Sequence, residues 1–203
     1  MRKAIFIDKD GTLVRNVPWN VDPEYIQLEP YAGEALRLLQ NGGYVLVVVT
    51  NQGGVAKGYF PESALSAVIR KVDALLAEQG VQLDGFFYCP HDLEGVVSGY
   101  AITCSCRKPA PGMMIRAAEE LHISLEGSWM LGDILNDVEA GNRSGCRSIL
   151  VDNGNETEWD LSPLRKPEFI AGNMLEAAEY IINCSGKNRS YGAHISDTDQ
   201  RFY

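Results

Sequence analysis

The chain has 203 residues, of which 45% are hydrophobic and 22% are charged, and its formal net charge is −9. This length fits one globular domain, and the acidic balance argues against a general nucleic-acid binder, whose surface is expected to be basic. No apolar run approaches the roughly 20 residues that a membrane-spanning helix needs, and charges interrupt the N-terminus too early for a signal peptide. We therefore expect a cytoplasmic protein that acts as a monomer and binds neither nucleic acid nor membranes.

Short apolar runs alternate with segments of helical periodicity along the chain. The solid apolar runs at 4–7 and 45–49 are typical of strands that are covered on both faces. Further strands are predicted at 86–88, 129–131, 148–151 and 169–170. Helices are predicted at 32–39, 65–76, 113–121, 135–142 and 174–182. This alternation predicts an α/β fold with a doubly wound, mostly parallel sheet, which binds ligands at the carboxyl ends of its strands.

The periodic part of the chain ends near residue 183, so we expect residues 1–183 to form the folded domain. A polar loop between residues 89 and 106 lies within it. Residues 184–203 turn polar and lose their periodicity. This change predicts a flexible C-terminal tail, although an ordered arm that packs on a neighbour is the alternative.

The first predicted strand runs directly into an acidic turn. Asp8 and Asp10 leave the strand two residues apart, so their carboxylates project to the same side, and Gly11 permits a sharp turn. Such a pair can hold Mg²⁺, which prefers carboxylate and water oxygens. One aspartate can instead attack phosphorus while the other transfers protons. A plain surface turn is the alternative, because Asp-Gly pairs are common in turns.

Two further segments offer groups that suit a phosphate. Thr50 and Asn51 end the second strand before two glycines, where their side chains can donate hydrogen bonds to an anion. A strand-end turn is the alternative there. Arg107 and Lys108 are adjacent cations, of which lysine supplies a compact charge and arginine can bond a second anionic group. The alternative for this pair is a solvated basic patch.

A fourth polar segment follows the strand predicted at 129–131. Asp133 and Asp137 lie four residues apart, so on a helical turn they share one face and can complete a cation site. The alternative role of Asp133 is to cap the helix that follows, for which aspartate is well suited. Capping and metal binding are compatible, so the segment is a candidate for both.

Three of the five cysteines cluster in the sequence with a histidine. Three thiolates and an imidazole form a tetrahedral ligand set for a structural zinc ion. The polar loop between the two ligand pairs has little apolar material to fold around, so zinc would fix this loop and place the two cations that follow it. The four predicted zinc ligands are Cys89, His91, Cys104 and Cys106.

These segments, in this order, resemble the haloacid dehalogenase-like superfamily of phosphatases over most of the chain. By this resemblance the protein is a phosphoric monoester hydrolase in which Asp8 is the nucleophile and forms an aspartyl-phosphate. Asp10 would protonate the leaving group and then activate water. Thr50 and Lys108 would steady the phosphoryl oxygens. The resemblance also implies that Mg²⁺ is held by Asp8, the backbone carbonyl of Asp10, and Asp133.

The cysteine and histidine pairs narrow this resemblance. They look like those of the D-glycero-D-manno-heptose 1,7-bisphosphate phosphatase family, which is grouped with the histidinol-phosphatase phosphatases. Such a relationship implies a fold without a large cap domain and a small phosphorylated substrate, such as the heptose bisphosphate hydrolysed at its 7-phosphate. It also implies substrate contacts from Trp19, Asn51 and Arg107. Gly53 and Ile134 depart from the family pattern, which commonly has a serine and a lysine at these positions.

Two alternatives to this function stay open. Within the phosphatase class, the substrate can be histidinol phosphate or another small phosphorylated metabolite. In a different class, the chain can be a catalytically silent binding protein of the same fold. The joint presence of Asp8, Asp10, Thr50, Lys108 and Asp133 argues against the silent protein, because binding alone does not need this set.

Overall fold

A computed structural model describes residues 1–192, and for residues 186–192 only the course of the backbone. Six strands form one sheet in the order β3-β2-β1-β4-β5-β6, and all neighbouring strands are parallel. The strands are β1 (Ala4–Ile7), β2 (Val45–Asn51), β3 (Gly85–Cys89), β4 (Trp129–Gly132), β5 (Arg147–Val151) and β6 (Phe169–Ala171). The predicted α/β fold with a parallel sheet is confirmed.

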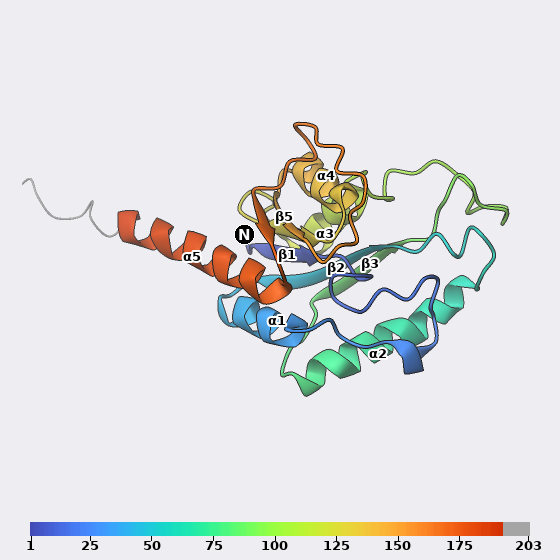
Figure 1. Cartoon of the computed structure of the whole chain (residues 1–203), viewed down its shortest axis with the longest axis horizontal. Helices are drawn as coiled ribbons and strands as arrows, with labels where there is room; N and C mark the ends of the chain where they lie inside the picture. Colours follow the sequence, from blue (N-terminus) through green and yellow to red (C-terminus); the bar gives the residue numbers. More distant parts are fainter. Residues whose placement is uncertain (193–203) are drawn as a thin grey trace, which may run out of the picture.

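Helices cover both faces of the sheet (Figure 1). One layer contains α1 (Ala32–Asn41), α2 (Leu65–Glu78) and α5 (Met174–Gly192), and the other contains α3 (Gly112–Leu121) and α4 (Leu135–Ser144). Two short 3₁₀ helices, η1 (Pro23–Tyr25) and η2 (Glu62–Ala64), lie in the connecting segments. This arrangement explains why the central strands are apolar without alternation, since neither face of them meets solvent.

The central strand β1 shows how the two layers are held. Its side chains alternate between the faces, so Ile5 and Ile7 pack in the cluster that includes α1, α2 and α5. Ala4 and Phe6 pack in the cluster that includes α3 and α4. All four are fully buried, and burial of each large side chain stabilises the fold by about 1.5–3 kcal/mol. The next charged side chain along the chain is Asp8, which directly follows the last residue of β1.

The order of the strands creates a switch point beside β1. From β1 the chain adds β2 and β3 on one side, whereas β4, β5 and β6 extend the other side. The connections therefore diverge between β1 and β4 and leave a crevice at the carboxyl ends of these two strands. Loops between the elements surround this crevice. Residues 1–192 form no separate cap domain.

The C-terminal helix is longer than the sequence predicts. The predicted boundary between residues 183 and 184 falls inside α5, which continues to Gly192. The Tyr44 hydroxyl and Ser185 Oγ are hydrogen-bonded at 2.6 Å, and Cys184 packs against the core. Once a helix is anchored, each further residue adds a hydrogen bond, so it can continue without an apolar stripe. The rest of the predicted tail, 193–203, lies outside the described residues.

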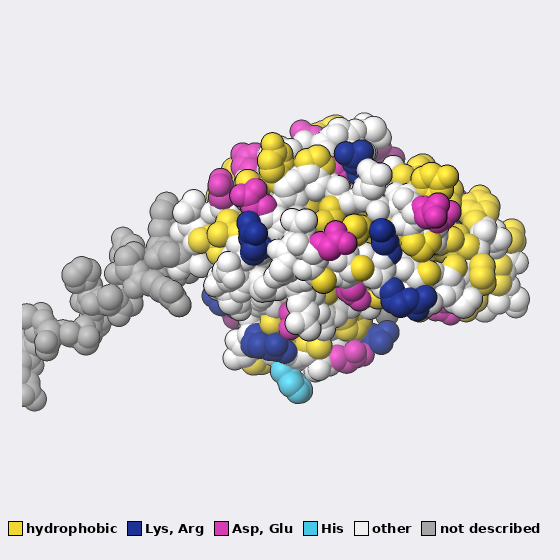
Figure 2. All heavy atoms as spheres, turned by 90° about the horizontal axis from the view of Figure 1, so that it is seen from below, with side chains coloured by type: hydrophobic (Ala, Val, Ile, Leu, Met, Phe, Trp, Pro, Cys, Tyr) yellow, Lys and Arg dark blue, Asp and Glu magenta, His cyan; other side chains and the backbone are white. Residues whose placement is uncertain are grey.

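The surface carries charges of both signs on the face shown in Figure 2, and hydrophobic side chains gather at the end remote from the C-terminal helix. Several loop residues near the crevice are large, apolar and exposed, namely Trp19, Tyr59, Leu93, Val96 and Ile102. Among the described residues, no helix has the length and apolar character required to cross a membrane.

Candidate active site

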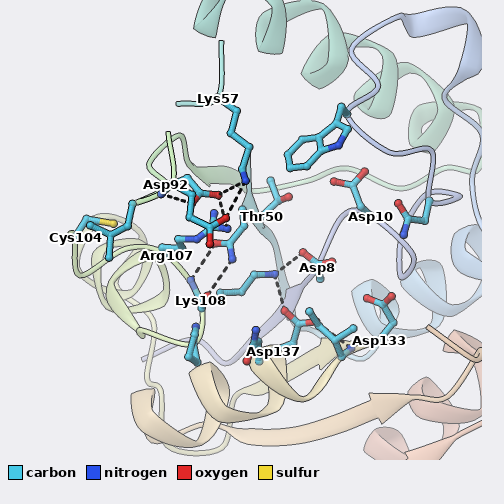
Figure 3. A pocket seen from close by; sticks show the side chains of 18 of the residues that line it. Asp8, Asp10, Thr50, Lys57, Asp92, Cys104, Arg107, Lys108, Asp133 and Asp137 are labelled. Atoms are coloured by element: carbon cyan, nitrogen blue, oxygen red, sulfur yellow. Dashed lines mark hydrogen bonds and ion pairs between the residues drawn. The ribbon is translucent and has the colours of Figure 1, made fainter. Parts of the chain in front are cut away.

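A cavity of about 910 Å³ opens at the carboxyl ends of the strands. Every residue that the sequence predicts to act on phosphate, Mg²⁺ or substrate lines this cavity: Asp8, Asp10, Trp19, Asn51, Thr50, Arg107, Lys108 and Asp133. They come from segments far apart in the sequence, which the parallel sheet brings to one edge (Figure 3). The volume lies within the range of small-molecule sites, and it leaves room for a ligand larger than one phosphate group.

The innermost group of the cavity is a buried ion cluster. Asp8 follows β1, and the Lys108 ammonium bonds with its carboxylate. The same ammonium lies 2.7 Å from Asp137 Oδ1 and donates to the carbonyl oxygen of Val49 at 3.1 Å. All three charged side chains are buried. The lysine is therefore held in one position between two carboxylates, from which it can face an anion bound at Asp8 (Figure 3).

The cluster carries two negative charges and one positive charge away from water, which changes its titration. Burial raises the pKa of Asp8 to about 7, although the charge of Lys108 opposes this rise, and the nearby carboxylates of Asp137 and Asp10 add to it. Burial alone would lower the pKa of Lys108, but Asp137 and Asp8 outweigh it and raise that pKa. Lys108 therefore stays charged, and the excess negative charge favours a further cation at Asp8.

Asp133 lies beside Asp8 after β4 and is held from two sides. Thr12 Oγ1 donates to its Oδ1 at 3.0 Å, and Asn155 Nδ2 donates to its Oδ2 at 2.7 Å. Burial, followed by the charge of Asp8, raises the pKa of Asp133 to about 6. Gly11 allows this approach, because its φ is +85° and a Cβ there would lie 2.2 Å from Asp133 Oδ2. The carboxylates of Asp8 and Asp133 thus converge at the inner end of the cavity.

The carboxylates of Asp8, Asp133 and Asp137 offer ligand atoms within 4.8 Å of one another. Asp137 is already engaged, since its Oδ1 lies next to Lys108 and its Oδ2 accepts the Ile134 N–H at 3.3 Å. Asp137 is therefore placed to position Lys108, and Asp8 and Asp133 are the carboxylates that can hold a metal ion. Hard oxygen donors that crowd like charges fit Mg²⁺, so the residues present suit the expected ion.

Asp10 lies on the cavity side of this cluster. Its Oδ2 accepts a hydrogen bond from Gln52 Nε2 at 3.0 Å, and its Oδ1 bonds with Lys9. Gln52 Nε2 also donates to Thr50 Oγ1 at 3.0 Å. The side chain of Asp10 is about one third exposed, so it can exchange protons with a ligand or water in the cavity. Gln52 links it to Thr50, the residue predicted to contact a phosphoryl oxygen.

Asn51 lines the cavity, but its amide is bonded to the main chain of Lys108. Asn51 Nδ2 donates to the Lys108 carbonyl at 3.1 Å, and the Lys108 N–H donates to Asn51 Oδ1 at 3.0 Å. These bonds tie the end of β2 to the segment that carries the buried lysine. The structure thus shows Asn51 as a support of Lys108, while the sequence predicts it as a substrate contact.

Arg107 and Trp19 form parts of the outer wall. Arg107 donates to the His91 carbonyl at 3.1 Å and to Asp92 Oδ2 at 3.0 Å. Trp19 is about half exposed, and Lys57 Nζ lies 5.8 Å from the centre of its ring. Both therefore stand where a ligand bound at Asp8 would extend towards solvent.

The predicted zinc ligands meet at one point beside this wall. Their ligand atoms lie within 4.8 Å of one another, with Sγ–Sγ separations of 2.9–3.5 Å and Nδ1–Sγ separations of 3.4 and 3.7 Å. Tetrahedral zinc with Zn–S bonds of about 2.3 Å places sulfurs about 3.7 Å apart. The sulfurs lie closer together than this, and the four donor atoms gather around one point.

The thiols of this cluster crowd one another in a way that a cation would relieve. All of them are free, and the shortest Sγ–Sγ separation is too long for a disulfide. Burial raises the pKa of Cys89, and its hydrogen bond with Cys106 adds to this effect. Three adjacent thiolates are stable only with a cation among them. The donor set fits a closed, structural zinc site.

Sequence reasoning missed several residues of the cavity. Lys57, Asp92 and Asn155 line the cavity, but no motif or spacing in the sequence singles them out. Lys57 and Asp92 lie on two loops and meet at 3.9 Å only in the folded chain. No sequence signal pairs them, because the contact depends on how the loop after β3 folds back.

The sequence comparisons identify the same group of enzymes. The family described as HAD-hydrolase-like matches residues 105–177. The D-glycero-beta-D-manno-heptose-1,7-bisphosphate 7-phosphatase of Pasteurella multocida (strain Pm70) is 44% identical over 167 residues, which cover 79% of this chain and 87% of the relative. The protein of the same name from Yersinia pestis is 41% identical over 187 residues and covers 89% of each chain.

Solved structures agree with these relatives. A putative HAD-like phosphatase from Mesorhizobium loti aligns with a TM-score of 0.79 and 35% identity, covering 90% of this chain and 87% of that one. The D,D-heptose 1,7-bisphosphate phosphatase of B. bronchiseptica, complexed with magnesium and phosphate, aligns with a TM-score of 0.73 and 28% identity, covering 89% and 98%. The chain therefore belongs to the haloacid dehalogenase-like phosphatases and is a phosphoric monoester hydrolase.

Proposed function

We propose that this chain is a Mg²⁺-dependent phosphatase that removes the 7-phosphate of D-glycero-D-manno-heptose 1,7-bisphosphate through an aspartyl-phosphate intermediate. The observation that carries the proposal is the position of the buried Asp8 carboxylate. It is paired with the Lys108 ammonium and lies close to the Asp133 carboxylate. A nucleophilic carboxylate that attacks a phosphate must be screened from the like charge of its substrate. The named relatives support the choice of sugar.

In the first half of the reaction, an oxygen of Asp8 attacks the phosphorus and forms an acyl phosphate. The bond between phosphorus and the sugar oxygen breaks, and Asp10 gives its proton to the departing oxygen. Lys108 Nζ offsets the charge that gathers on the phosphoryl oxygens, and Thr50 Oγ1 donates a hydrogen bond to one of them. Asn51 and Asp137 keep Lys108 in place for this role.

In the second half, Asp10 is a carboxylate and takes a proton from a water molecule in the cavity. That water attacks phosphorus, the acyl–phosphate bond breaks, and inorganic phosphate leaves as Asp8 is regenerated. The position of Asp10 on the cavity side, about one third exposed and bonded to Gln52, suits a group that exchanges a proton in each half.

Two metal ions complete the proposal. Mg²⁺, held by Asp8, Asp133 and the backbone carbonyl of Asp10, would supply positive charge beside the reacting phosphate. Zinc, held by the cysteine and histidine cluster, would fix the loop that ends in Arg107 and Lys108. We assign the outer wall, with Arg107 and Trp19, to the distal part of the sugar. The free thiols also favour a reducing, cytoplasmic location.

Purified protein with Mg²⁺ tests this function on a substrate panel. The panel contains both anomers of the heptose bisphosphate, the heptose 7-phosphate and histidinol phosphate, and released phosphate is measured. We expect the highest kcat/KM with one anomer of the bisphosphate. A higher kcat/KM with histidinol phosphate, or with another phosphorylated metabolite, would show that this compound is the substrate instead of the heptose bisphosphate. Phosphate release that does not require added Mg²⁺ after metal removal would overturn the metal dependence.

Two variants test the nucleophile. Asp8→Asn should abolish phosphate release, because the amide cannot attack phosphorus at a useful rate. Asp160→Asn is the matched control, since this aspartate is exposed and does not line the cavity. If the activity of Asp8→Asn is close to that of the control, another residue must be the nucleophile. Trapping of the phosphoryl group on the wild-type chain, but not on Asp8→Asn, would support the intermediate.

A further inference from the structure

The outer wall of the cavity contains an ion cluster that the proposed chemistry does not use. Asp92 Oδ2 lies 3.0 Å from Arg107 and 3.9 Å from Lys57 Nζ, so one carboxylate is shared by two cations (Figure 3). Lys57 Nζ also lies 3.3 Å from Glu94. Asp92 is buried, whereas the side chain of Glu94 is 84% exposed. Because solvent screens the charge of Glu94, Asp92 is the main counter-ion of Lys57.

These cations are separate from the one at the reacting centre. Among the described residues that line the cavity, the lysines and arginines are Lys57, Arg107 and Lys108. Lys108 is committed to Asp8 and Asp137 at the inner end. Of these three cations, Lys57 and Arg107 are therefore the two left to bond a second anionic group on the ligand, and both lie on the outer wall.

The contact of Lys57 with the loop is not needed to hold that loop in place. The loop after β3 already docks on the turn after β2 through two main-chain bonds, since the N–H groups of Val96 and Val97 donate to the Ala56 carbonyl at 2.8 and 2.9 Å. Gly95 packs so closely that an added Cβ would lie 2.7 Å from Ala56. The side chain of Lys57 adds charge to a junction that is already formed.

Gly53 leaves the space that the ion cluster occupies. A Cβ at this position would lie 2.8 Å from Asp92 Oδ2 and 3.0 Å from an Arg107 guanidinium nitrogen. Any larger residue would push the pair apart. The absence of a side chain at Gly53 and the presence of a carboxylate at Asp92 thus belong to one arrangement, in which the two cations are partly neutralised before a ligand arrives.

We propose that Lys57 joins Arg107, which is assigned above to the distal part of the sugar, in a subsite for a second anionic group, and that Asp92, their shared counter-ion, limits the affinity of this subsite. The inference rests on the proposed phosphatase pocket. A cation that already bonds a buried carboxylate has less attraction left for a ligand. Lys57 and Asp92 are therefore specificity-determining residues that act in opposite directions on the same ligand group.

Opposite changes in two variants test this proposal. The readout is the competitive inhibition of p-nitrophenyl phosphate hydrolysis by glucose 6-phosphate and by glucose 1,6-bisphosphate, which differ only in the distal phosphate. Lys57→Met removes a cation and should lower the preference for the bisphosphate about tenfold, as loss of one charged hydrogen bond does. Asp92→Asn removes the counter-ion, keeps an oxygen acceptor, and should raise that preference severalfold.

The controls separate a charge effect from a loss of structure. Lys166→Met is the matched control, because this lysine is exposed and does not line the cavity, and its Ki ratio should equal that of the wild type. Zinc content and thermal stability are measured for every variant. A merely structural cluster would lower both affinities together in Lys57→Met and Asp92→Asn, and this result would overturn the proposal, as would a fall of the ratio in Asp92→Asn.

The test is independent of the sugar assigned above. Wild-type protein that fails to hydrolyse the heptose bisphosphate would refute the proposed substrate, yet the ratio of the two glucose phosphates would still report on the subsite. Equal inhibition of the wild type by both glucose phosphates would refute the subsite even if the heptose bisphosphate is the substrate. The two failures are therefore distinguishable.

Discussion

Gly11 is the position at which the geometry of the site predicts the sharpest effect of a single methyl group. In Gly11→Ala the new Cβ would lie 2.2 Å from Asp133 Oδ2, and the two atoms must separate to at least 3.0 Å. The carboxylate, bonded by Thr12 and Asn155, must therefore shift by about 0.8 Å or distort the turn. A misplacement of about 1 Å can reduce catalysis about 100-fold.

The same substitution also strains the backbone, and this strain needs its own control. Gly11 has a φ of +85°, which costs an alanine about 1–2 kcal/mol. Gly43 has the same φ of +85° with nothing within 4 Å of an added Cβ, and it does not line the cavity. Gly43→Ala should therefore lose similar stability and keep its activity, so that it isolates the effect on Asp133.

The assay compares kcat/KM and the Mg²⁺ concentration for half-maximal activity in the two variants and the wild type. We expect Gly11→Ala to lose about 30- to 100-fold in kcat/KM and to require more Mg²⁺, and Gly43→Ala to match the wild type. If Gly11→Ala stays within threefold of Gly43→Ala in both quantities, the role of Asp133 and of this close approach is refuted.

Three further predictions concern the metals, the pH and the buried lysine. Cys106→Ser should lose bound zinc and lower Tm by about 5 °C or more, whereas Cys184→Ser should keep its zinc. Elemental analysis measures the zinc content and thermal denaturation measures Tm. Equal zinc contents in the two variants would refute the role of Cys106 as a zinc ligand. The folded pKa values of Asp8 and Asp133, about 7 and about 6, lie above their ordinary 3.8, so folding favours their protonated forms. Metal-free protein should therefore lose stability as the pH rises from about 4 to about 7, and excess Mg²⁺ should restore it at the upper end; a Tm that rises with pH in the metal-free protein contradicts this. Asp137→Asn removes the charge that positions Lys108 and should lower kcat about tenfold or more with a smaller change in KM; an unchanged kcat would show that Lys108 needs no such support.

Local pattern in the sequence was enough to predict the inner part of the site. Asp8, Thr50 and Asp133 each stand where a solid apolar run stops. Parallel strands bring their carboxyl ends to one edge, so these residues had to meet once the strands paired in this way. The meeting of Cys89, His91, Cys104 and Cys106 was predictable for a similar reason, since two close pairs that flank one loop need only that loop to fold back.

The outer wall could not be predicted in this way. Lys57 and Asp92 are 35 positions apart on loops, and their contact depends on hydrogen bonds between the loop after β3 and Ala56. The sequence predicts Asn51 as a substrate contact, and the bonds of its amide with the main chain of Lys108 are visible only in the structure. Such partners are chosen by loop geometry, which leaves no period or spacing in the sequence.

The sequence by itself determined the fold class, the family resemblance and the residues at the strand ends, because burial and strand polarity act through local patterns. Only the tertiary structure decided which charges share a partner. It placed Lys108 between Asp8 and Asp137, and it gave Lys57 and Arg107 a common counter-ion. The net charge of −9 argues against a broad polyanion binder, whereas only the fold places Lys108 at the inner end of the cavity and Lys57 and Arg107 on its outer wall.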